Sequence, residues 1–170
     1  MKLFPAITLA LILTASLAAS AAGVDDPLDV AKSLYLAASY SEALSALDKL
    51  PDGADLAAAD KYRALCFLGL DRQADAEHAL ESLVMRQPQY SMDQLESPKL
   101  VAMFKSIRAR KLPEVAKNMF ASAKSTYDKG DMKGAAEDFE SALRSAPDDW
   151  PLRRETQGLL EIARRQSGGR

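Results

Sequence analysis

The chain has 170 residues, of which 22 are lysine or arginine and 24 are aspartate or glutamate, so the formal net charge is −2. This balance argues against nucleic acid as the main partner, because nucleic-acid-binding domains usually present a clearly basic face. The chain contains one cysteine, which excludes an intrachain disulfide. Its stability must therefore come from packing, and its length is enough for one domain with a hydrophobic core.

The N-terminal segment, residues 1–22, has the pattern of a secretory signal peptide. A lysine follows the first methionine, residues 3–17 are almost wholly apolar, and residues 19–21 are small. We expect cleavage after Ala21 or Ala22 and export of the remaining chain. The alternative is an uncleaved membrane anchor, since an apolar stretch of nearly ~20 residues can just span a bilayer.

Beyond this segment, apolar residues recur at steps of three and four, and no alternation of period two persists. The sequence therefore predicts an all-α fold. The clearest pattern lies in residues 116–149, which predict two helices joined by a turn. Ala123 and Ala135 would let these helices approach closely, and Phe139 would fill the space beside their contact.

The turn and the end of this segment carry matching signals. Gly130 suits the left-handed conformation that ends the first helix, Asp131 suits the N-cap of the second, and Pro147 stops the second helix. Residues of these types stand at the spacings of a tetratricopeptide repeat, and the whole segment is similar to that family. The resemblance implies a helical scaffold that binds proteins, not an enzyme.

An earlier unit, residues 57–88, repeats this pattern. Ala64, Ala76 and Pro88 lie 59 residues before Ala123, Ala135 and Pro147, and Leu80 stands where Phe139 stands. We expect helices at about 56–68 and 72–86. Gly69 lies two residues before the position of the turn glycine in the later unit, which leaves the geometry of this turn open.

A first unit is predicted at residues 24–53. Ala31, Tyr40 and Ala43 lie 33 residues before Ala64, Gln73 and Ala76, which is close to one repeat period. This unit is short, as terminal repeats often are, because it caps the stack.

Residues 89–115 interrupt the spacing and predict an inserted helix. Ser97 is suited to its N-cap and Pro98 to its first position, and its apolar face is Leu100, Val101, Phe104 and Ile107. The stretch from Ser97 to Phe104 resembles a segment of bacterial envelope repeat proteins. Pro113 is expected to begin the long first helix of the third unit.

The C-terminal part, residues 151–166, predicts an end helix that covers the last pair, and residues 167–170 are expected to be disordered. The 23–166 region is thus expected to form a short α-solenoid: about three helix pairs of the tetratricopeptide type, with an inserted helix and a C-terminal capping helix.

Catalysis finds little support in the sequence. A hydrolase needs a nucleophile and a base brought together, and a zinc site needs three or four convergent ligands. The only histidine, His78, is expected on a solvated helix face, and Cys66 in an apolar stripe, where it acts as a small hydrophobe. The alternatives are a catalytic or metal role for His78 and a redox role or an intermolecular disulfide for Cys66. We predict no enzyme, no metal and no cofactor.

A locally basic stretch accompanies the insertion, and RNA or lipid headgroups are the alternatives it raises. A solvated helix face is the favoured interpretation, since the charges are spread around the helix. The stretch comprises Lys99, Lys105, Arg108, Arg110, Lys111 and Lys117.

The family resemblance implies that the first helix of each pair lines a concave groove for a partner peptide or helix. The predicted partner-binding residues are Lys61, Leu65, Lys117, Phe120, Lys124, Tyr127 and Asp128, with Lys32, Tyr35, Leu36, Leu68 and Gly69 as further candidates. Lysines with tyrosines suit a peptide that carries some negative charge. The competing interpretation is that several of these side chains pack within the protein.

We therefore expect a non-enzymatic protein–protein interaction scaffold of the bacterial cell envelope, exported and located in the periplasm. The alternative is a membrane-anchored structural subunit of an envelope complex that keeps its N-terminal helix in the inner membrane. Self-association is open, and so is the question whether residues 89–115 cover or extend the groove.

Overall fold

The computed structural model describes residues 26–93 and 96–168. The predicted signal peptide, residues 1–22, and the last two residues lie outside the described part. All regular structure in the described residues is helical, so the predicted all-α fold is confirmed. The seven helices found there are α1 (Pro27–Leu36), α2 (Tyr40–Leu47), α3 (Leu56–Gly69), α4 (Gln73–Arg86), α5 (Pro98–Asp128), α6 (Met132–Ser145) and α7 (Arg153–Ser167).

The helices form three hairpins, which we call unit 1 (α1 and α2), unit 2 (α3 and α4) and unit 3 (the C-terminal half of α5, and α6). The small residues that the sequence places at the helix contacts have an exposed fraction of 0% in every unit: Ala31 and Ala43, Ala64 and Ala76, Ala123 and Ala135. Leu47, Leu80 and Phe139 fill equivalent positions beside them and are at most 1% exposed. This shared register is compatible with helical repeats.

Each hairpin also turns through a residue in the left-handed region at the same position. These residues are Ala38 with φ 58°, Asp71 with φ 57° and Gly130 with φ 85°. The prediction for Gly130 is confirmed, whereas in unit 2 the left-handed residue is Asp71 and Gly69 is the last residue of α3. The N-cap predictions are also confirmed, because Asp131 accepts from the amide of Gly134 and Ser97 from that of Leu100.

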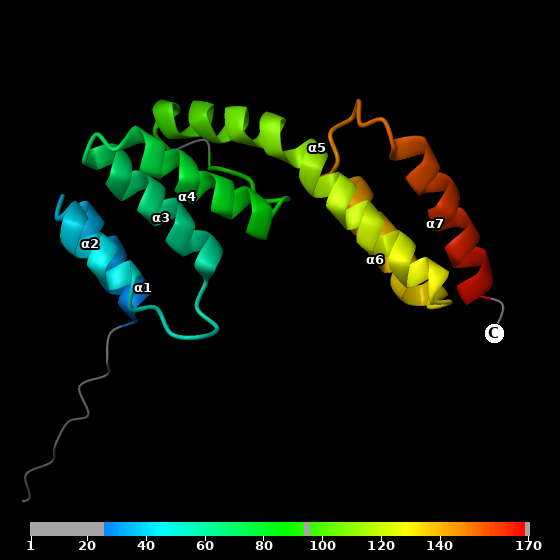
Figure 1. Ribbon diagram of the computed structural model, residues 1–170. Helices are drawn as coiled ribbons and strands as arrows, with labels where there is room; N and C mark the ends of the chain where they lie inside the picture. Colours follow the sequence, from blue (N-terminus) through cyan, green and yellow to red (C-terminus); the bar gives the residue numbers. More distant parts are fainter. Residues whose placement is uncertain (1–25, 94–95, 169–170) are drawn as a thin grey trace, which may run out of the picture.

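The structure corrects the expected role of Pro113. This residue lies inside α5 and does not begin a new helix, so the predicted inserted helix and the first helix of unit 3 are one helix of 31 residues. A proline within a helix removes one backbone hydrogen bond and favours a kink, but it does not have to end the helix. Figure 1 shows α5 bending between its green and yellow-green parts. The packed faces on both sides of Pro113 hold the helix together.

The bend in α5 separates two groups of helices (Figure 1). The N-terminal half of α5 shares a core with α3 and α4, in which Leu100, Phe104 and Ile107 are buried. The C-terminal half shares a second core with α6 and α7. The helix α7 extends through Ser167, so the expectation of disorder is wrong for that residue.

A buried charge joins unit 1 to unit 2. Asp60 is 4% exposed and pairs with Arg63 at 3.1 Å and with Arg86 at 3.3 Å. Arg63 also donates to the carbonyl oxygen of Leu47 in α2, with an N–O distance of 2.8 Å. Since a buried carboxylate is costly without such partners, this network fixes how the two hairpins stack.

Candidate functional site

A groove lies along the C-terminal half of α5, and we call it the α5 groove. Its volume is about 620 Å³, and its lining residues are Lys117, Phe120, Ala121, Lys124, Ser125, Asp128, Lys129 and Leu152. Four of the seven predicted partner-binding residues are among them: Lys117, Phe120, Lys124 and Asp128. The sequence thus brings these four side chains to one surface by placing them on one side of a single helix.

The floor of the α5 groove is apolar and well supported. Phe120 is 9% exposed, and its ring centroid lies 6.0 Å from that of Phe139 and 6.2 Å from that of Trp150. Leu152, in the segment before α7, adds an apolar side chain from outside α5. Because these groups belong to the packed core of unit 3, the floor is held in place before any partner arrives.

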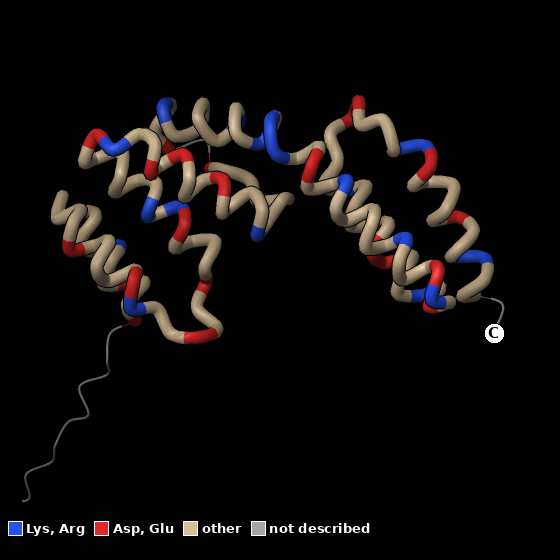
Figure 2. Tube along the Cα trace, viewed as in Figure 1, with Lys and Arg blue, Asp and Glu red and all other residues tan. Residues whose placement is uncertain are grey.

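The rim of the α5 groove is mostly cationic. Lys124 forms an ion pair with Asp128 at 3.1 Å, whereas Lys117 and Lys129 form no ion pair within the described residues. Two lysine ammonium groups therefore stay available at its edges. Elsewhere Lys and Arg are interspersed with Asp and Glu along the chain (Figure 2).

Tyr127 has a different position from the lining residues. Its ring is half-buried and lies 6.3 Å from the ring of Phe139, within the core of unit 3. The structure therefore places Tyr127 against the core of unit 3, beside Phe139, and not among the lining residues of the α5 groove.

Lys61 and Leu65 do not line the α5 groove. Leu65 is buried in the core shared by α3, α4 and α5. The ammonium group of Lys61 lies 2.7 Å from the carboxylate of Glu96 and 5.0 Å from the centroid of the Tyr62 ring. Burial tends to lower the pKa of Lys61, but the hydrogen bond and the charge of Glu96 outweigh it, and the pKa is raised.

The segment between α4 and α5 lies against unit 2. Besides the contact of Glu96, Tyr90 and Met92 pack on the core of unit 2, and the ring of Tyr90 lies 5.9 Å from that of Phe104. Burial raises the pKa of the Tyr90 hydroxyl. The described part of this segment therefore covers the face of unit 2 that carries Lys61.

The further candidates in units 1 and 2 are spread over several environments. Lys32 pairs with Asp29 at 2.8 Å, and the ring of Tyr35 lies between those of Tyr40 and Tyr62, at 5.9 and 5.7 Å. Leu36 is 82% exposed, and Leu68 packs against the core of unit 2. The candidate partner-binding residues of units 1 and 2 therefore do not line one common groove, as those of α5 do.

Half of the basic stretch forms contacts within the protein. Arg110 and Lys111 of α5 pair with Glu81 of α4 at 2.6 and 3.1 Å, and these hydrogen bonds lower the pKa of the Glu81 carboxyl. Arg108 donates to the carbonyl oxygen of Tyr90 and lies over the ring of Phe104. Three of the six basic residues therefore hold α5 against its neighbours. The interpretation of the whole stretch as a solvated helix face is wrong for these three.

The side chains with catalytic potential are kept apart. His78 is exposed on α4, and Cys66 is fully buried on α3, where burial raises the pKa of its thiol to about 11. A thiol of this kind is a poor nucleophile because its reactive thiolate is scarce at neutral pH. Within residues 26–93 and 96–168, no three histidine, cysteine, aspartate or glutamate side chains gather as metal ligands would.

None of the helices in the described residues has the length and apolar character needed to cross a membrane. No match to the chain is found among protein-family models, curated proteins or solved structures. The α5 groove is therefore interpreted from its own geometry.

Four lining residues of this groove are not predicted from the sequence: Ala121, Ser125, Lys129 and Leu152. For two of them a signal was present. Ala121 and Ser125 stand at the positions of Tyr62 and Cys66 in unit 2, where larger or apolar side chains are packed. A change from such residues to the small side chains of Ala121 and Ser125 indicates an open face.

Proposed function

We propose that the protein is a non-enzymatic protein–protein interaction scaffold of the bacterial cell envelope, similar in design to tetratricopeptide repeat proteins. Its α5 groove holds an extended peptide or a helix of a partner protein. The observation that carries this proposal is a supported apolar floor, with Phe120 and Leu152, beside two lysines without ion-pair partners among the described residues.

The dimensions of the groove fit a peptide segment. Its lining residues on α5 and its C-cap run from Lys117 to Lys129, which is about 18 Å along a helix axis. This length accommodates about five residues of an extended chain or three turns of a helix. An apolar side chain of the partner would rest on Phe120, and acidic side chains near its ends would meet Lys117 and Lys129.

The proposal of export rests on residues 1–22, whose pattern predicts a cleaved signal peptide. The periplasm is the compartment proposed. N-terminal sequencing of the protein from cells tests it, with a mature chain starting at Ala22 or Gly23 as the expected result. A chain that still starts at Met1 would favour the anchored structural subunit.

Site-specific photocrosslinking in cells tests the groove itself. Ala121 is exposed and lies in the α5 groove, whereas Ala109 is exposed on the other half of α5 and serves as the matched control. A photoreactive phenylalanine at position 121 is expected to capture a partner, and one at position 109 is not. Equal adducts at both positions, or none at 121, would remove the support for a peptide site.

Charge reversal then tests the kind of partner. Replacing both Lys117 and Lys129 by glutamate should weaken binding of the captured segment about tenfold or more at low ionic strength, because two attractions become repulsions. Lys105→Glu is the control, since Lys105 is an exposed lysine of α5 outside the groove. Weakening by the control to the same extent would show that only the total charge matters.

A further inference from the structure

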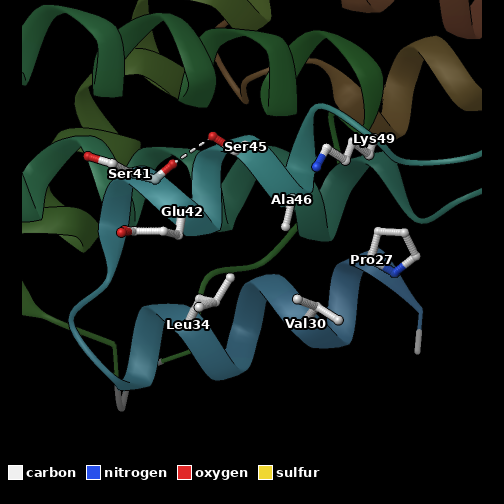
Figure 3. Close-up of a pocket in the computed structure, with 8 residues that line it drawn as sticks. All are labelled: Pro27, Val30, Leu34, Ser41, Glu42, Ser45, Ala46 and Lys49. Atoms are coloured by element: carbon white, nitrogen blue, oxygen red, sulfur yellow. Dashed lines mark hydrogen bonds between the residues drawn. The ribbon is translucent and has the colours of Figure 1, made fainter. Parts of the chain in front are cut away.

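The outer face of unit 1, on the side away from unit 2, is uncovered within the described residues. We call it the N-terminal face. It forms a groove of about 560 Å³ whose lining residues are Pro27, Val30 and Leu34 from α1, and Ser41, Glu42, Ser45, Ala46 and Lys49 from α2 and the turn after it (Figure 3). The α1 contribution is apolar.

The equivalent face of unit 2 is a stacking surface. Asp60, Arg63 and Phe67 lie 33 residues after Pro27, Val30 and Leu34. Arg63 reaches across to unit 1, where it donates to the carbonyl oxygen of Leu47 at 2.8 Å. The C-terminal core is likewise covered, since Leu160 and Ala163 of α7 are buried in it. The N-terminal face therefore has the character of a stacking surface without its neighbour.

The charges on the N-terminal face have a distinctive order. Glu42, Ser45 and Ala46 follow one another at steps of three and one, so they share one side of α2, and Lys49 lines the same groove from the turn after the helix. Glu42 and Lys49 are exposed and stand at opposite ends of the α2 side of this groove (Figure 3), and neither forms an ion pair within the described residues. Between them the helix carries small side chains, which permit another helix to approach closely.

We propose that a second copy of this chain docks on the N-terminal face, with α2 antiparallel to α2 of the other copy. A two-fold axis in the interface, perpendicular to α2, places Glu42 opposite Lys49 of the second copy and Ser45 opposite Ala46. The charge pair is then formed twice, because an isologous interface repeats every contact. The close approach at Ser45 and Ala46 brings both ion pairs into reach.

The same axis matches the apolar residues of α1. Leu34 lies at the Glu42 end of the face and Pro27 at the Lys49 end (Figure 3). The axis therefore sets Leu34 against Pro27 of the second copy and Val30 against Val30. An axis parallel to the helices would instead lay Glu42 over Leu34 and bury a charge without a partner, which is costly. The charge order selects the antiparallel arrangement.

This inference does not depend on the α5 groove, because the two surfaces lie on different units. The dimer would leave unit 3 of each copy outside the interface. A pair of α5 grooves would thus be presented together, and a partner with two suitable segments would gain avidity.

Sedimentation equilibrium of the protein as purified from cells tests the proposal. The wild type is expected to be a dimer, with a dissociation constant that rises with ionic strength. Glu42→Lys and Lys49→Glu should each raise that constant about tenfold or more, since each places like charges opposite one another twice. The double variant E42K/K49E restores both ion pairs and should return the constant to within about threefold of wild type. Glu137→Lys reverses an exposed charge of α6 and should leave it unchanged.

Three results would overturn the proposal. A wild type that stays monomeric up to millimolar concentration leaves no dimer to explain, and the face would then belong to another protein or to the N-terminal segment. A dimer that both single reversals leave intact lies elsewhere on the molecule. Two weakening single reversals without recovery in E42K/K49E would exclude the antiparallel register.

Discussion

Units 2 and 3 have cores built at equivalent positions but differ in the surroundings of their first helix. At the helix contacts Ala64 and Ala123 are equivalent and both fully buried. One residue further along, Leu65 in unit 2 is buried in a core, whereas its equivalent in unit 3, Lys124, is exposed in the α5 groove. The same register therefore yields a covered face in one unit and an open face in the other.

The neighbours of each unit explain this difference. The first helix of unit 2 packs on unit 1, where the rings of Tyr35 and Tyr62 are 5.7 Å apart, and its Lys61 pairs with Glu96 of the segment between α4 and α5. In unit 3 the first helix is the continuation of α5, and Ala121 and Ser125 on the equivalent side stay exposed. A hairpin core can therefore be repeated along a chain, while the binding surface of each hairpin depends on its neighbouring segments.

The substitutions with the largest expected effect on stability test whether the cores of units 2 and 3 are equivalent. Leu80→Ala and Phe139→Ala each remove a fully buried side chain and should lower the free energy of unfolding by about 2–5 kcal/mol. Urea unfolding followed by circular dichroism measures this. Leu36→Ala, at an 82% exposed position, is the control and should change stability by less than about 0.5 kcal/mol. A large effect in only one unit would mean that the two positions do not play the same structural part.

Much of the hairpin structure is predictable from such positions. The buried alanines, Gly130 and Asp131 signal close approach, a left-handed turn and an N-cap through local chemistry that needs no knowledge of the rest of the chain. The expected helices of unit 2, about 56–68 and 72–86, agree with α3 and α4 to within about one residue.

The sequence-based predictions that the structure corrects concern contacts between segments that are distant along the chain. Pro113 is a local signal for a helix start, but the cores on either side of it keep α5 continuous. Lys61 matches the pattern of a groove residue, and only the fold shows that Glu96, 35 residues later, reaches it. On α5 the prediction is more complete, because its residues are neighbours along a single helix and need no distant partner to be placed.

The next largest expected effect comes from a substitution at the end of the first helix, where units 2 and 3 differ. Gly69 and Asp128 are equivalent, but a Cβ atom at Gly69 would lie 2.5 Å from Cε2 of Tyr40 in unit 1. Gly69→Ala should therefore destabilise the protein by about 1–2 kcal/mol, because the ring of Tyr40 must move away from Tyr35. Thermal unfolding of the purified variants provides the measurement.

Asp128→Ala is the matched change in unit 3. It removes an exposed ion pair with Lys124 and should alter stability by less than about 0.5 kcal/mol. If Gly69→Ala were as mild as Asp128→Ala, the contact between units 1 and 2 at Tyr40 would be loose, and the contrast between a covered and an open helix would weaken.

The smallest effect concerns how each unit holds the next helix along the chain. Glu81 of α4 pairs with Arg110 and Lys111 of α5, and its equivalent in unit 3, Glu140 of α6, pairs with Arg164 of α7 at 2.7 Å. The side chain of Glu81 is 21% exposed and that of Glu140 is 36% exposed. We therefore expect the ion pairs of Glu81 to contribute more to the free energy of unfolding than those of Glu140, about 1 kcal/mol.

The pH dependence of stability shows whether this contribution is electrostatic. The pKa of Glu81 is lowered from its ordinary value of 4.5 by the hydrogen bonds of Lys111 and Arg110. A lowered pKa in the folded state gives stability that is present above pH 4.5 and is lost as the pH falls below it, when the carboxylate is protonated. The difference in unfolding free energy between wild type and Glu81→Gln should therefore be largest at neutral pH and shrink under acid.

Glu77→Gln, on the same helix α4 and without an ion pair among the described residues, should show no such trend. A difference that stays constant with pH would mean that Glu81 holds α5 through packing and not through its charge.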